Sequence, residues 1–250
     1  MRAIIIAAGK GTRLYPLTKN TPKSLLEIGK GLTLLESQLH SLKENNIKDV
    51  TIIVGYRAEQ IEAKLKKYDG DFNINTIFNP FYDCSNNLVS VWMARHLMDD
   101  EFITINGDDL FKPSVIENLL KSKNNITMVI DEKEKYDEDD MKVVHHDGLI
   151  QKVSKKIPIV ETNGESIGII KFSGKGPKIY VNVLEEMVRK KENLNIFYLQ
   201  AIQEIINKGY PVHFSKCAPD DWAELDFHPD LVLIKQYLKK SNLIDTIFAD

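Results

Sequence analysis

Residues 4–29, "IIIAAGKGTRLYPLTKNTPKSLLEIG", place an apolar run before two glycines, an arginine and a Pro-Lys pair. Gly9 and Gly11 permit close backbone approach to a ligand, and the Arg13 guanidinium can hold phosphate oxygens with two hydrogen bonds. Lys23, which follows a proline, adds a second cation. The pattern fits a phosphate-binding loop, and it fits equally an ordinary turn after a strand with solvated surface cations.

Two familiar glycine-rich nucleotide motifs do not match this loop. A dinucleotide-binding fingerprint requires a third glycine at the position where Leu14 stands. A Walker A loop requires a longer gap before its Gly-Lys-Ser/Thr. NAD-dependent redox chemistry and P-loop chemistry are therefore disfavoured.

Acidic residues occur in two further segments where a metal ligand and an ordinary turn residue are both reasonable. Asp108 and Asp109 in "INGDDLF" directly follow an apolar strand candidate. Glu224 and Asp226 in "WAELDFHPDL" alternate along an extended segment, so their side chains should share one face. Because Gly and Asp are common in turns, these residues alone do not separate a metal site from solvated acids.

The elements that must position these residues alternate between strands and helices in the first half of the chain. Runs that are apolar on both faces, as in parallel strands covered by helices, lie at residues 2–8, 48–56 and 102–106. Helical patterns lie between these runs, at residues 32–46, 57–68 and 86–98. This order predicts a doubly wound α/β fold, in which ligands bind outside the carboxyl ends of the strands.

The second half of the chain predicts a small antiparallel insert and further helices. Asp147-Gly148 stands between two β-rich runs, which is a strong hairpin signal. The densely charged residues 133–140 predict a solvated loop before it. Further strands are expected at residues 125–132, 165–173 and 211–216, and helices at 113–123, 178–191, 195–208 and from about 229. With no internal repeat or long linker, one domain over residues 1–250 is expected.

Composition limits the classes of protein to which the chain can belong. The 250 residues are 43% hydrophobic and 28% charged, as in soluble globular proteins. A net charge of −3 gives no global attraction to nucleic acid or to an anionic membrane, so neither is an expected partner. Cys84 and Cys217 have no metal-binding spacing, and a cytoplasmic location is expected. The apolar run at residues 3–8 is too short to span a membrane.

The stretch "AIIIAAGKGTRLYPLTKNTPKSLLEIG" resembles the signature of nucleotidyltransferases that join a nucleoside triphosphate to a sugar phosphate or a small phosphorylated alcohol. The resemblance continues through "IVGY", "INGDDLF", the hairpin and "WAELDFHPDL", and so covers almost the whole chain. It implies a Rossmann-like, GT-A-type fold with a mixed, mostly parallel sheet flanked by helices and a small antiparallel hairpin insert. It also implies a nucleotide-binding half at residues 1–125 and an acceptor-binding half at residues 126–250.

The resemblance implies a magnesium site as well. A Mg²⁺ ion held by carboxylates commonly offsets the charge repulsion when a triphosphate is attacked. The first aspartate of the "INGDDLF" motif binds Mg²⁺ in resembling enzymes and corresponds to Asp108, and the second ligand corresponds to Asp226. Asp109 lies at a variable position, and whether it or Glu224 joins the metal site is left open. The expected catalytic residues are Arg13, Lys23, Asp108 and Asp226.

A glycine-rich segment that usually precedes the metal strand in hexose 1-phosphate enzymes is absent. In its place, "FNPFYDCSNNLVSVWMARHL" is similar to the Asn-Asn and Ser pattern of CTP:phosphocholine cytidylyltransferase-like proteins. Asn87 is expected near the nucleotide or acceptor, whereas Asn86 could equally cap the helix that follows. The resemblance assigns nucleotide binding to Ala7, Ala8, Gly9, Gly11, Thr12, Arg13, Gly55, Tyr56, Asn79, Asn87 and Ser90.

The hairpin region resembles phosphocholine and inositol-phosphate cytidylyltransferase branches, in which lysines that flank the hairpin face the active site. The expected acceptor-binding residues are Lys23, Lys142, Lys155 and Glu165. Lysines beside a hairpin are otherwise usually solvated. Four aromatic residues could surround a quaternary ammonium group, although packing is their commoner use: Trp92, Tyr180, Tyr198 and Trp222.

The resemblance therefore implies a Mg²⁺-dependent cytidylyltransferase, in which an acceptor phosphate attacks the α-phosphorus of CTP and releases pyrophosphate. The acceptor is open among phosphocholine, phosphoglutamine, aminoethylphosphonate, inositol phosphate and glycerol phosphate, with a product for capsule or cell-surface polysaccharide synthesis. A hexose 1-phosphate uridylyl- or thymidylyltransferase and a non-catalytic nucleotide-binding module are the alternatives. The terminal segment "LIDTIFAD" could pack on its own domain or against a second subunit of a homodimer.

Overall fold

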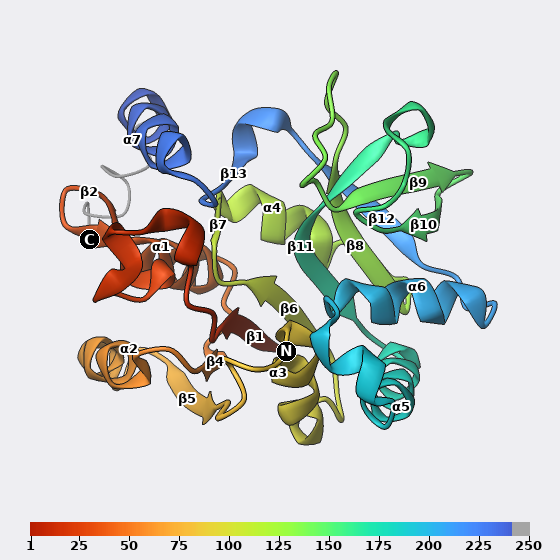
Figure 1. Cartoon of the computed structure of the whole chain (residues 1–250), viewed down its shortest axis with the longest axis horizontal. Helices are drawn as coiled ribbons and strands as arrows, with labels where there is room; N and C mark the ends of the chain where they lie inside the picture. The colour runs from red at the N-terminus through yellow and green to blue at the C-terminus, as the bar shows by residue number, and fades with distance from the viewer. Residues whose placement is uncertain (242–250) are drawn as a thin grey trace.

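The computed structural model describes residues 1–241 and is built around a mixed sheet of nine strands (Figure 1). These strands are β1 (Arg2–Ala7), β4 (Asp49–Val54), β5 (Asn73–Phe78), β6 (Phe102–Asn106), β8 (Ile126–Asp131), β9 (Lys142–His146), β10 (Leu149–Val153), β11 (Gly164–Phe172) and β12 (His213–Cys217). Their order in the sheet is β5-β4-β1-β6-β11-β8-β12-β10-β9. β1 pairs in parallel with β4 and β6, whereas β11 runs antiparallel to β6 and β8. The expected α/β fold with a mixed sheet is confirmed.

Helices cover both faces of this sheet, which explains why its inner strands are apolar along their whole length. The helices are α1 (Leu34–Glu44), α2 (Ala58–Leu65), α3 (Asn87–Met93), α4 (Pro113–Leu120), α5 (Gly176–Val188), α6 (Leu199–Asn207) and α7 (His228–Ser241). Ile4 of β1 belongs to a core formed with α3, α5 and α6, and Ile5 belongs to a core formed with α1, α2 and α4. Adjacent residues of β1 enter different cores because side chains alternate between the faces of a strand.

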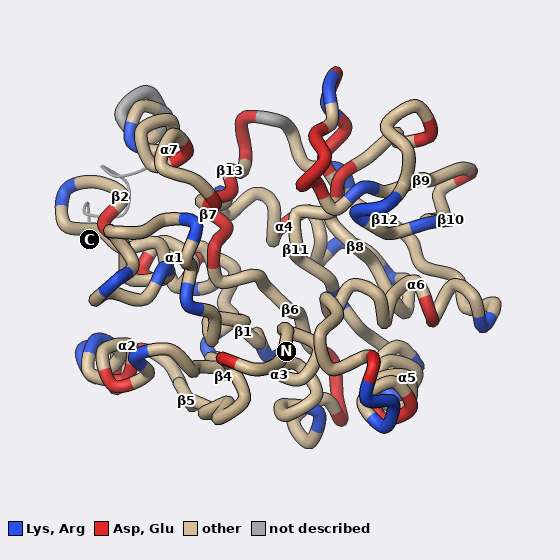
Figure 2. Tube along the Cα trace, in the orientation of Figure 1, with Lys and Arg blue, Asp and Glu red and all other residues tan. Residues whose placement is uncertain are grey.

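A separate two-stranded sheet brings the C-terminal part of the chain to the end of β6. It pairs β7 (Asp109–Phe111) with β13 (Trp222–Glu224), and Glu224 lies opposite Asp109. The backbone N–H of Leu225 donates to Asp108 O at 3.0 Å. Figure 2 shows acidic residues of the two segments close together. The pairing places two acidic motifs side by side although they are far apart in the sequence. The second two-stranded sheet pairs β2 (Glu27–Gly29) with β3 (Leu32–Thr33).

Most expected elements are present, whereas the edge strand β5 and the short strands β2, β3, β7 and β13 were not expected. β9 and β10 form the predicted hairpin, with positive φ angles of 49° at Asp147 and 78° at Gly148. β5 was missed because it is an edge strand whose apolar residues are interrupted by asparagine and threonine. β7 was missed because it is only three residues long. The helix expected at residues 195–208 begins at Leu199, since Lys191–Asn195 forms a short 3-10 helix.

The C-terminal part contains the expected last helix, which is α7. The segment "LIDTIFAD", for which packing on its own domain or on a second subunit was left open, lies outside the described residues. Among residues 1–241, no helix is long and apolar enough to cross a membrane.

Candidate active site

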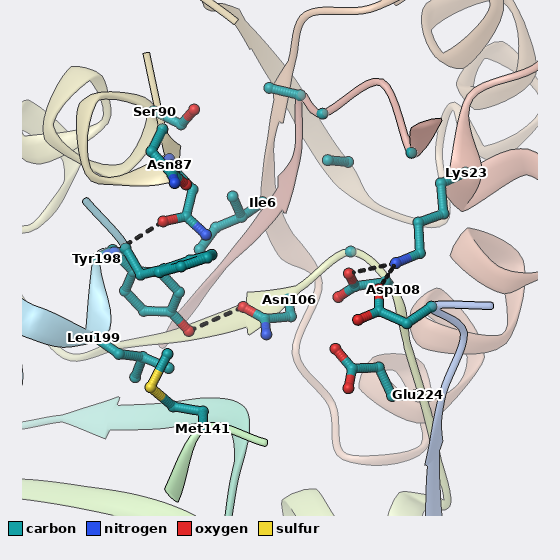
Figure 3. Close-up of a pocket in the computed structure, with 18 of the residues that line it drawn as sticks. Ile6, Lys23, Asn87, Ser90, Asn106, Asp108, Met141, Tyr198, Leu199 and Glu224 are labelled. Atoms are coloured by element: carbon teal, nitrogen blue, oxygen red, sulfur yellow. Dashed lines mark hydrogen bonds and ion pairs between the residues drawn. The ribbon is translucent and has the colours of Figure 1, made fainter. Parts of the chain in front are cut away.

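A pocket opens at the carboxyl ends of β1 and β6, where the doubly wound pattern predicts a ligand (Figure 3). Its volume of about 460 Å³ suits a small-molecule ligand. The glycine loop contributes Ala7, Ala8, Gly9, Gly11, Thr12 and Arg13 to its lining. The other expected site residues in the lining are Lys23, Asn87, Ser90, Asp108, Lys155, Glu165 and Asp226. Most of the expected residues therefore converge on one cavity.

The glycine loop packs on Lys23 and leaves space at Gly9. Gly11 has a φ of 60° and precedes the 3-10 helix η1 (Thr12–Leu14). A Cβ at Gly11 would lie 3.1 Å from Lys23 Cβ, so a side chain there would crowd the lysine. A Cβ at Gly9 would meet no other described residue within 4 Å, although Gly9 lines the pocket. The space beside Gly9 is therefore available to a ligand.

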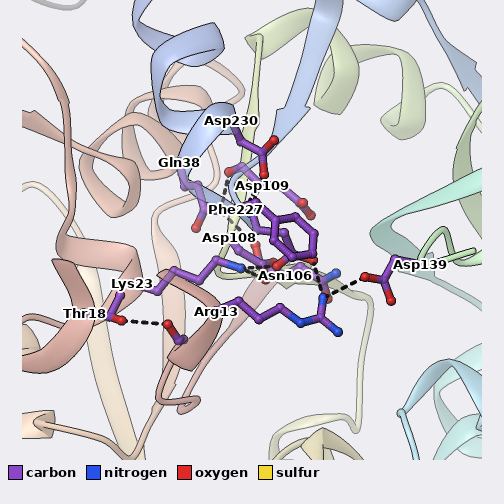
Figure 4. Close-up of polar contacts among 12 residues, drawn as sticks. Arg13, Thr18, Lys23, Gln38, Asn106, Asp108, Asp109, Asp139, Phe227 and Asp230 are labelled. Atoms are coloured by element: carbon purple, nitrogen blue, oxygen red, sulfur yellow. Dashed lines mark hydrogen bonds and ion pairs between the residues drawn. The ribbon is translucent and has the colours of Figure 1, made fainter. Parts of the chain in front are cut away.

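Lys23 lies between two carboxylates that come from the middle and the end of the chain (Figure 4). Its Nζ donates to Asp108 Oδ2 at 2.8 Å and to Asp226 Oδ1 at 2.5 Å. Burial by itself lowers the pKa of Lys23, but the two carboxylates outweigh burial and raise this pKa above its ordinary value. Lys23 is therefore a charged ammonium at neutral pH.

Arg13 belongs to the same cluster. Its Nη1 is 3.1 Å from Asp226 Oδ2, and its guanidinium lies 5.3 Å from the centroid of the Phe227 ring. Burial tends to raise the pKa of Asp226, but Lys23 and then Arg13 hold this pKa below its usual value. The expected cations and carboxylates thus form one connected charge network.

Carboxylate oxygens gather beside Lys23 in a set that suits a divalent cation. One oxygen each from Asp108, Asp109 and Glu224 lies within 4.8 Å of the other two. Desolvation, with Asp108 and Asp226 nearby, raises the pKa of Glu224 to about 8. Asp109 Oδ2 is buried and has no hydrogen-bond partner among the described residues. Carboxylate oxygens are hard ligands, and their mutual repulsion favours a bound Mg²⁺ ion. Glu224 lines the pocket together with Asp108 and Asp226.

Two hydrogen bonds from α1 hold the loop that carries Asp108. Gln38 Nε2 donates to Asn106 O at 2.8 Å and to Asp109 O at 2.7 Å, and the Gln38 residue is 1% exposed. These two bonds fix the backbone on both sides of Asp108. Sequence reasoning missed Gln38 because a single polar residue on an amphipathic helix forms no motif.

A chain of hydrogen bonds crosses the other end of the pocket (Figure 3). Asn86 caps α3, since its Oδ1 accepts a hydrogen bond from Asn87 N at 2.7 Å. Asn87 Oδ1 accepts from Tyr198 N at 2.8 Å, and the Tyr198 hydroxyl donates to Asn106 Oδ1 at 3.0 Å. Asn106 also lines the pocket, and it was missed because it is the last residue of an otherwise apolar strand.

Three residues that we expected to bind nucleotide support the pocket lining instead. Asn79 is fully buried, and its Nδ2 donates to Ser90 Oγ at 2.9 Å. Tyr56 N donates to Ala8 O at 3.0 Å, and a Cβ at Gly55 would lie 2.7 Å from the same oxygen. These three residues are absent from the pocket lining in the described part of the chain. All three therefore support residues of the lining, and their direct contact with a nucleotide stays a prediction.

Lys142 also departs from its expected position. It is 1% exposed, and its Nζ donates to Asp137 O and Glu138 O, each at 3.0 Å. Within residues 1–241, the pocket lining does not include Lys142. Its ammonium holds the charged loop at residues 133–140, so its expected contact with an acceptor is replaced by a structural one.

Charged side chains of both signs line the part of the pocket beside the loop at residues 133–140. Asp139 Oδ2 lies 3.4 Å from Arg13 Nη1, and Asp139 Oδ1 lies 3.9 Å from Lys155 Nζ. Glu165 is 3% exposed and pairs with Lys133 at 2.5 Å. Burial raises the pKa of Glu165 to about 7, although Lys133 opposes this shift. Asp139 was missed because dense charge in a loop does not indicate which carboxylate faces inward.

The four aromatic residues considered for a cation cage do not meet at the pocket. Tyr180 is fully buried in the core, and Trp92 packs against the same core. Trp222 Nε1 donates to Asp131 Oδ2 at 2.9 Å. Of the four, the part of the pocket that the structure describes includes Tyr198 alone. The cage interpretation is therefore wrong, because packing uses the other three rings.

The sequence also matches a known family over most of its length. The family model described as "Nucleotidyl transferase" matches residues 2–214, which include the glycine loop and the Asp108 loop. The chain belongs to the nucleotidyl transferase family. The nucleotidyltransferase resemblance and the enzyme class expected from the sequence are confirmed.

Curated relatives of this nucleotidyltransferase include two cytidylyltransferases. A choline-phosphate cytidylyltransferase of Streptococcus pneumoniae is 38% identical over 49% of this chain and 51% of its own length. A CTP:phosphoglutamine cytidylyltransferase of Campylobacter jejuni is 26% identical over 92% of this chain and 98% of its own length. The match therefore spans about half of the first relative and almost all of the second.

Solved structures share the fold of this nucleotidyltransferase. A CTP:phosphocholine cytidylyltransferase from Streptococcus pneumoniae has a TM-score of 0.78 at 24% identity, over 95% of this chain and 98% of its own. An inositol-1-phosphate CTP transferase from T. maritima has a TM-score of 0.78 at 22% identity, over 96% of each chain. At these identities the likeness supports the fold alone.

Proposed function

We propose that this nucleotidyltransferase is a Mg²⁺-dependent cytidylyltransferase that transfers CMP from CTP to a small phosphorylated alcohol or amide. The products would be a CDP-linked compound and pyrophosphate. One observation carries the proposal: the Lys23 ammonium is held between Asp108 and Asp226 in a pocket that the glycine loop lines. The names of the cytidylyltransferase relatives support CTP as the donor.

Positioning and charge neutralisation would account for the reaction without a general base. A phosphate monoester is already ionised near neutral pH, so its oxygen can attack the α-phosphorus directly. The new P–O bond forms as the bond to the leaving pyrophosphate breaks. The space beside Gly9 would receive the nucleotide, and Arg13 would pair with the leaving phosphates.

The carboxylate cluster would also help to neutralise the charge of the phosphates, through a bound metal ion. Asp108 and Asp226, with Glu224, would hold Mg²⁺, which offsets the negative charge of the phosphates when it is bound. Lys23, released from one of its carboxylates, would donate to an oxygen of the α-phosphate or of the acceptor. Because Lys23 is already charged, this contact needs no proton transfer.

We further propose that residues 1–125 supply most of the nucleotide side and residues 126–250 supply the acceptor side. Lys155 and Glu165 line the pocket there and would contact the acceptor. Lys142 would act indirectly, by holding the charged loop that carries Asp139. Phosphocholine and phosphoglutamine are candidate acceptors, because the relatives are named for them.

Pyrophosphate release in the presence of Mg²⁺ tests this proposal. CTP, UTP, dTTP, ATP and GTP would each be combined with phosphocholine, phosphoglutamine, aminoethylphosphonate, inositol 1-phosphate and glucose 1-phosphate. Release confined to CTP with a non-sugar acceptor supports the proposal. Release from UTP or dTTP with glucose 1-phosphate would identify a hexose 1-phosphate enzyme instead. Nucleotide binding without release would identify a non-catalytic module.

A further inference from the structure

The residues that lead into α7 contact the glycine loop and the chain that follows it at three successive positions. Asp226 Oδ2 lies 3.1 Å from Arg13 Nη1. The ring centroid of Phe227 lies 5.3 Å from the guanidinium carbon of Arg13 (Figure 4). His228 Nε2 lies 2.7 Å from Tyr15 O. The start of α7 is therefore part of the wall that holds the charges of the active site.

Asp230, the third residue of α7, holds the backbone of this contact region. Its Oδ2 accepts hydrogen bonds from Asp226 N at 2.8 Å and from Phe227 N. In a capping box, the side chain at the third helical position accepts from the residue just before the helix, which is Phe227 here. The bond from Asp226 N reaches one residue further than this pattern requires. It connects Asp230 to a residue that we expect to bind the metal.

The two sides of Asp226 are held in different ways. Leu225, which precedes it, is fully buried and packs in one core with Leu14 and with Ile234 of α7. Phe227, which follows it, is exposed, so packing does not fix the backbone on that side. The hydrogen bonds to Asp230 supply what packing lacks there.

The side-chain contacts of Asp226 would change during the proposed reaction. In the metal-free chain, its carboxylate is held by Lys23 at 2.5 Å and by Arg13 at 3.1 Å. In the proposed function, both cations would turn to phosphate groups, and the carboxylate would turn to Mg²⁺. The direction of Asp226 would then depend on its backbone, because the ion pairs that orient it now would be lost.

We propose that Asp230 is a positioning residue, which keeps Asp226 directed at the metal through its bonds to the backbone of Asp226 and Phe227. The inference rests on the proposed function, since that function gives Asp226 its role. Within residues 1–241, the pocket lining does not include Asp230, so Asp230 acts through its neighbours. Partners that orient metal ligands typically change metal affinity by about 10–100-fold.

Binding of Mn²⁺ to the full chain without substrate tests this role. Mn²⁺ prefers the same oxygen ligands as Mg²⁺, and electron paramagnetic resonance measures its free concentration. Asp230→Ala should weaken Mn²⁺ binding by about ten-fold. In pyrophosphate release, the same variant should need about ten-fold more Mg²⁺ for half-maximal activity, with kcat restored at saturating Mg²⁺.

Two further variants separate positioning from helix stability. Asp230→Asn keeps an oxygen acceptor in the same place, so Mn²⁺ binding should stay within about three-fold of wild type. Ile234→Val removes one buried methyl group from α7 and leaves both hydrogen bonds in place, so it should bind Mn²⁺ as wild type does. Equal weakening in Asp230→Ala and Ile234→Val would overturn the inference, and so would equal weakening in Asp230→Ala and Asp230→Asn.

Asp226→Asn distinguishes a failure of this inference from a failure of the proposed function. If Asp226→Asn weakens Mn²⁺ binding and Asp230→Ala does not, Asp226 binds the metal without help from Asp230, and the inference alone is wrong. If Asp226→Asn leaves Mn²⁺ binding unchanged, the metal role of Asp226 is wrong, and the inference is overturned with it.

Discussion

The two sides of the active-site pocket hold their charges in different ways. On the side that we propose for the nucleotide, Lys23 and Asp226 are in direct contact at 2.5 Å. On the side that we propose for the acceptor, Lys155 and Asp139 are 3.9 Å apart, and Asp139 lies on a loop that Lys142 holds through backbone carbonyls. The side that we propose for the nucleotide thus holds its charges in one closely paired centre, whereas the side that we propose for the acceptor combines the close pair of Lys133 with Glu165 and a more open arrangement on the loop.

We infer from this difference that the rate of transfer and the choice of acceptor depend on different residues. A pocket distinguishes related substrates by only a few kcal/mol, which changes in a loop can supply. Transfer at the α-phosphorus depends instead on a fixed set of charges. Substitutions on the nucleotide side should therefore lower turnover with every acceptor, whereas those on the acceptor side should mainly change the KM for the acceptor.

Among the variants that test this comparison, Lys23→Met should have the largest effect on activity. It removes the cation between Asp108 and Asp226, so kcat should fall by about 1,000-fold, as for other lost transition-state contacts. Steady-state pyrophosphate release with saturating CTP measures this change. Lys19→Met, an exposed lysine of the same region, is the matched control and should keep kcat within about two-fold. Similar kcat values for the two variants would contradict a central role for Lys23.

Gln38→Leu should come next, because it leaves the carbonyl oxygens of Asn106 and Asp109 without their donor. Each lost partner costs about 1–3 kcal/mol, so the free energy of unfolding should fall. The Mg²⁺ concentration for half-maximal activity should also rise by about ten-fold, since the Asp108 loop loses its support. Ser41→Ala, which removes a similar bond to Phe111 O on the same helix, is the control. An equal Mg²⁺ requirement in both variants would refute this positioning role.

Glu165→Gln should change the pH dependence of stability. The pKa of Glu165 rises from 4.5 to about 7 in the folded chain, so the folded state binds this proton more tightly than the unfolded state. The contribution of Glu165 to stability is therefore present below about pH 4.5 and is lost as pH rises to 7. The loss should be on the order of 3 kcal/mol at most.

Urea unfolding at pH 5 and at pH 7.5 measures this effect. The difference in free energy of unfolding between the wild-type chain and Glu165→Gln should shrink or change sign between these pH values. Glu161→Gln, an exposed glutamate that pairs with Lys152, is the control and should follow the wild-type curve. A pH-independent difference between wild type and Glu165→Gln would contradict the raised pKa.

Asp139→Asn should have the smallest effect. It frees Arg13 and Lys155 from an exposed carboxylate, and such exposed pairs are worth about 0.2–1 kcal/mol. The KM for the acceptor should fall by about two- to five-fold, with kcat within two-fold of wild type. Glu134→Gln in the same loop is the control. A large loss of kcat would show that Asp139 belongs to the chemical centre.

Local sequence motifs were enough to locate the centre of the pocket, because the residues of these motifs directly follow the ends of strands. The glycine loop and Asp108 end two parallel strands that are neighbours in the sheet, so their convergence follows from the fold. Asp226 is different, since it reaches the site only through the pairing of β7 with β13, and neither strand was predicted. Its place came from the family resemblance.

Other residues could not be placed from sequence because residue type does not give the direction of a side chain. Lys142 faces a loop and Asn79 is buried behind Ser90, although both matched expected positions. Gln38 and Asp139 gave no signal, because each depends on neighbours that are distant in the sequence. Tertiary contacts, not local pattern, decide these roles.

The most direct test of cytidylyl transfer is phosphorus NMR of the complete reaction with CTP, Mg²⁺ and the acceptor that gives turnover. The account predicts equal amounts of pyrophosphate and of a CDP-linked product, whose two coupled phosphorus signals show a new P–O–P bond to the acceptor phosphate. Formation of CMP with unchanged acceptor, or a nucleotide product from UTP or dTTP instead of CTP, would contradict it.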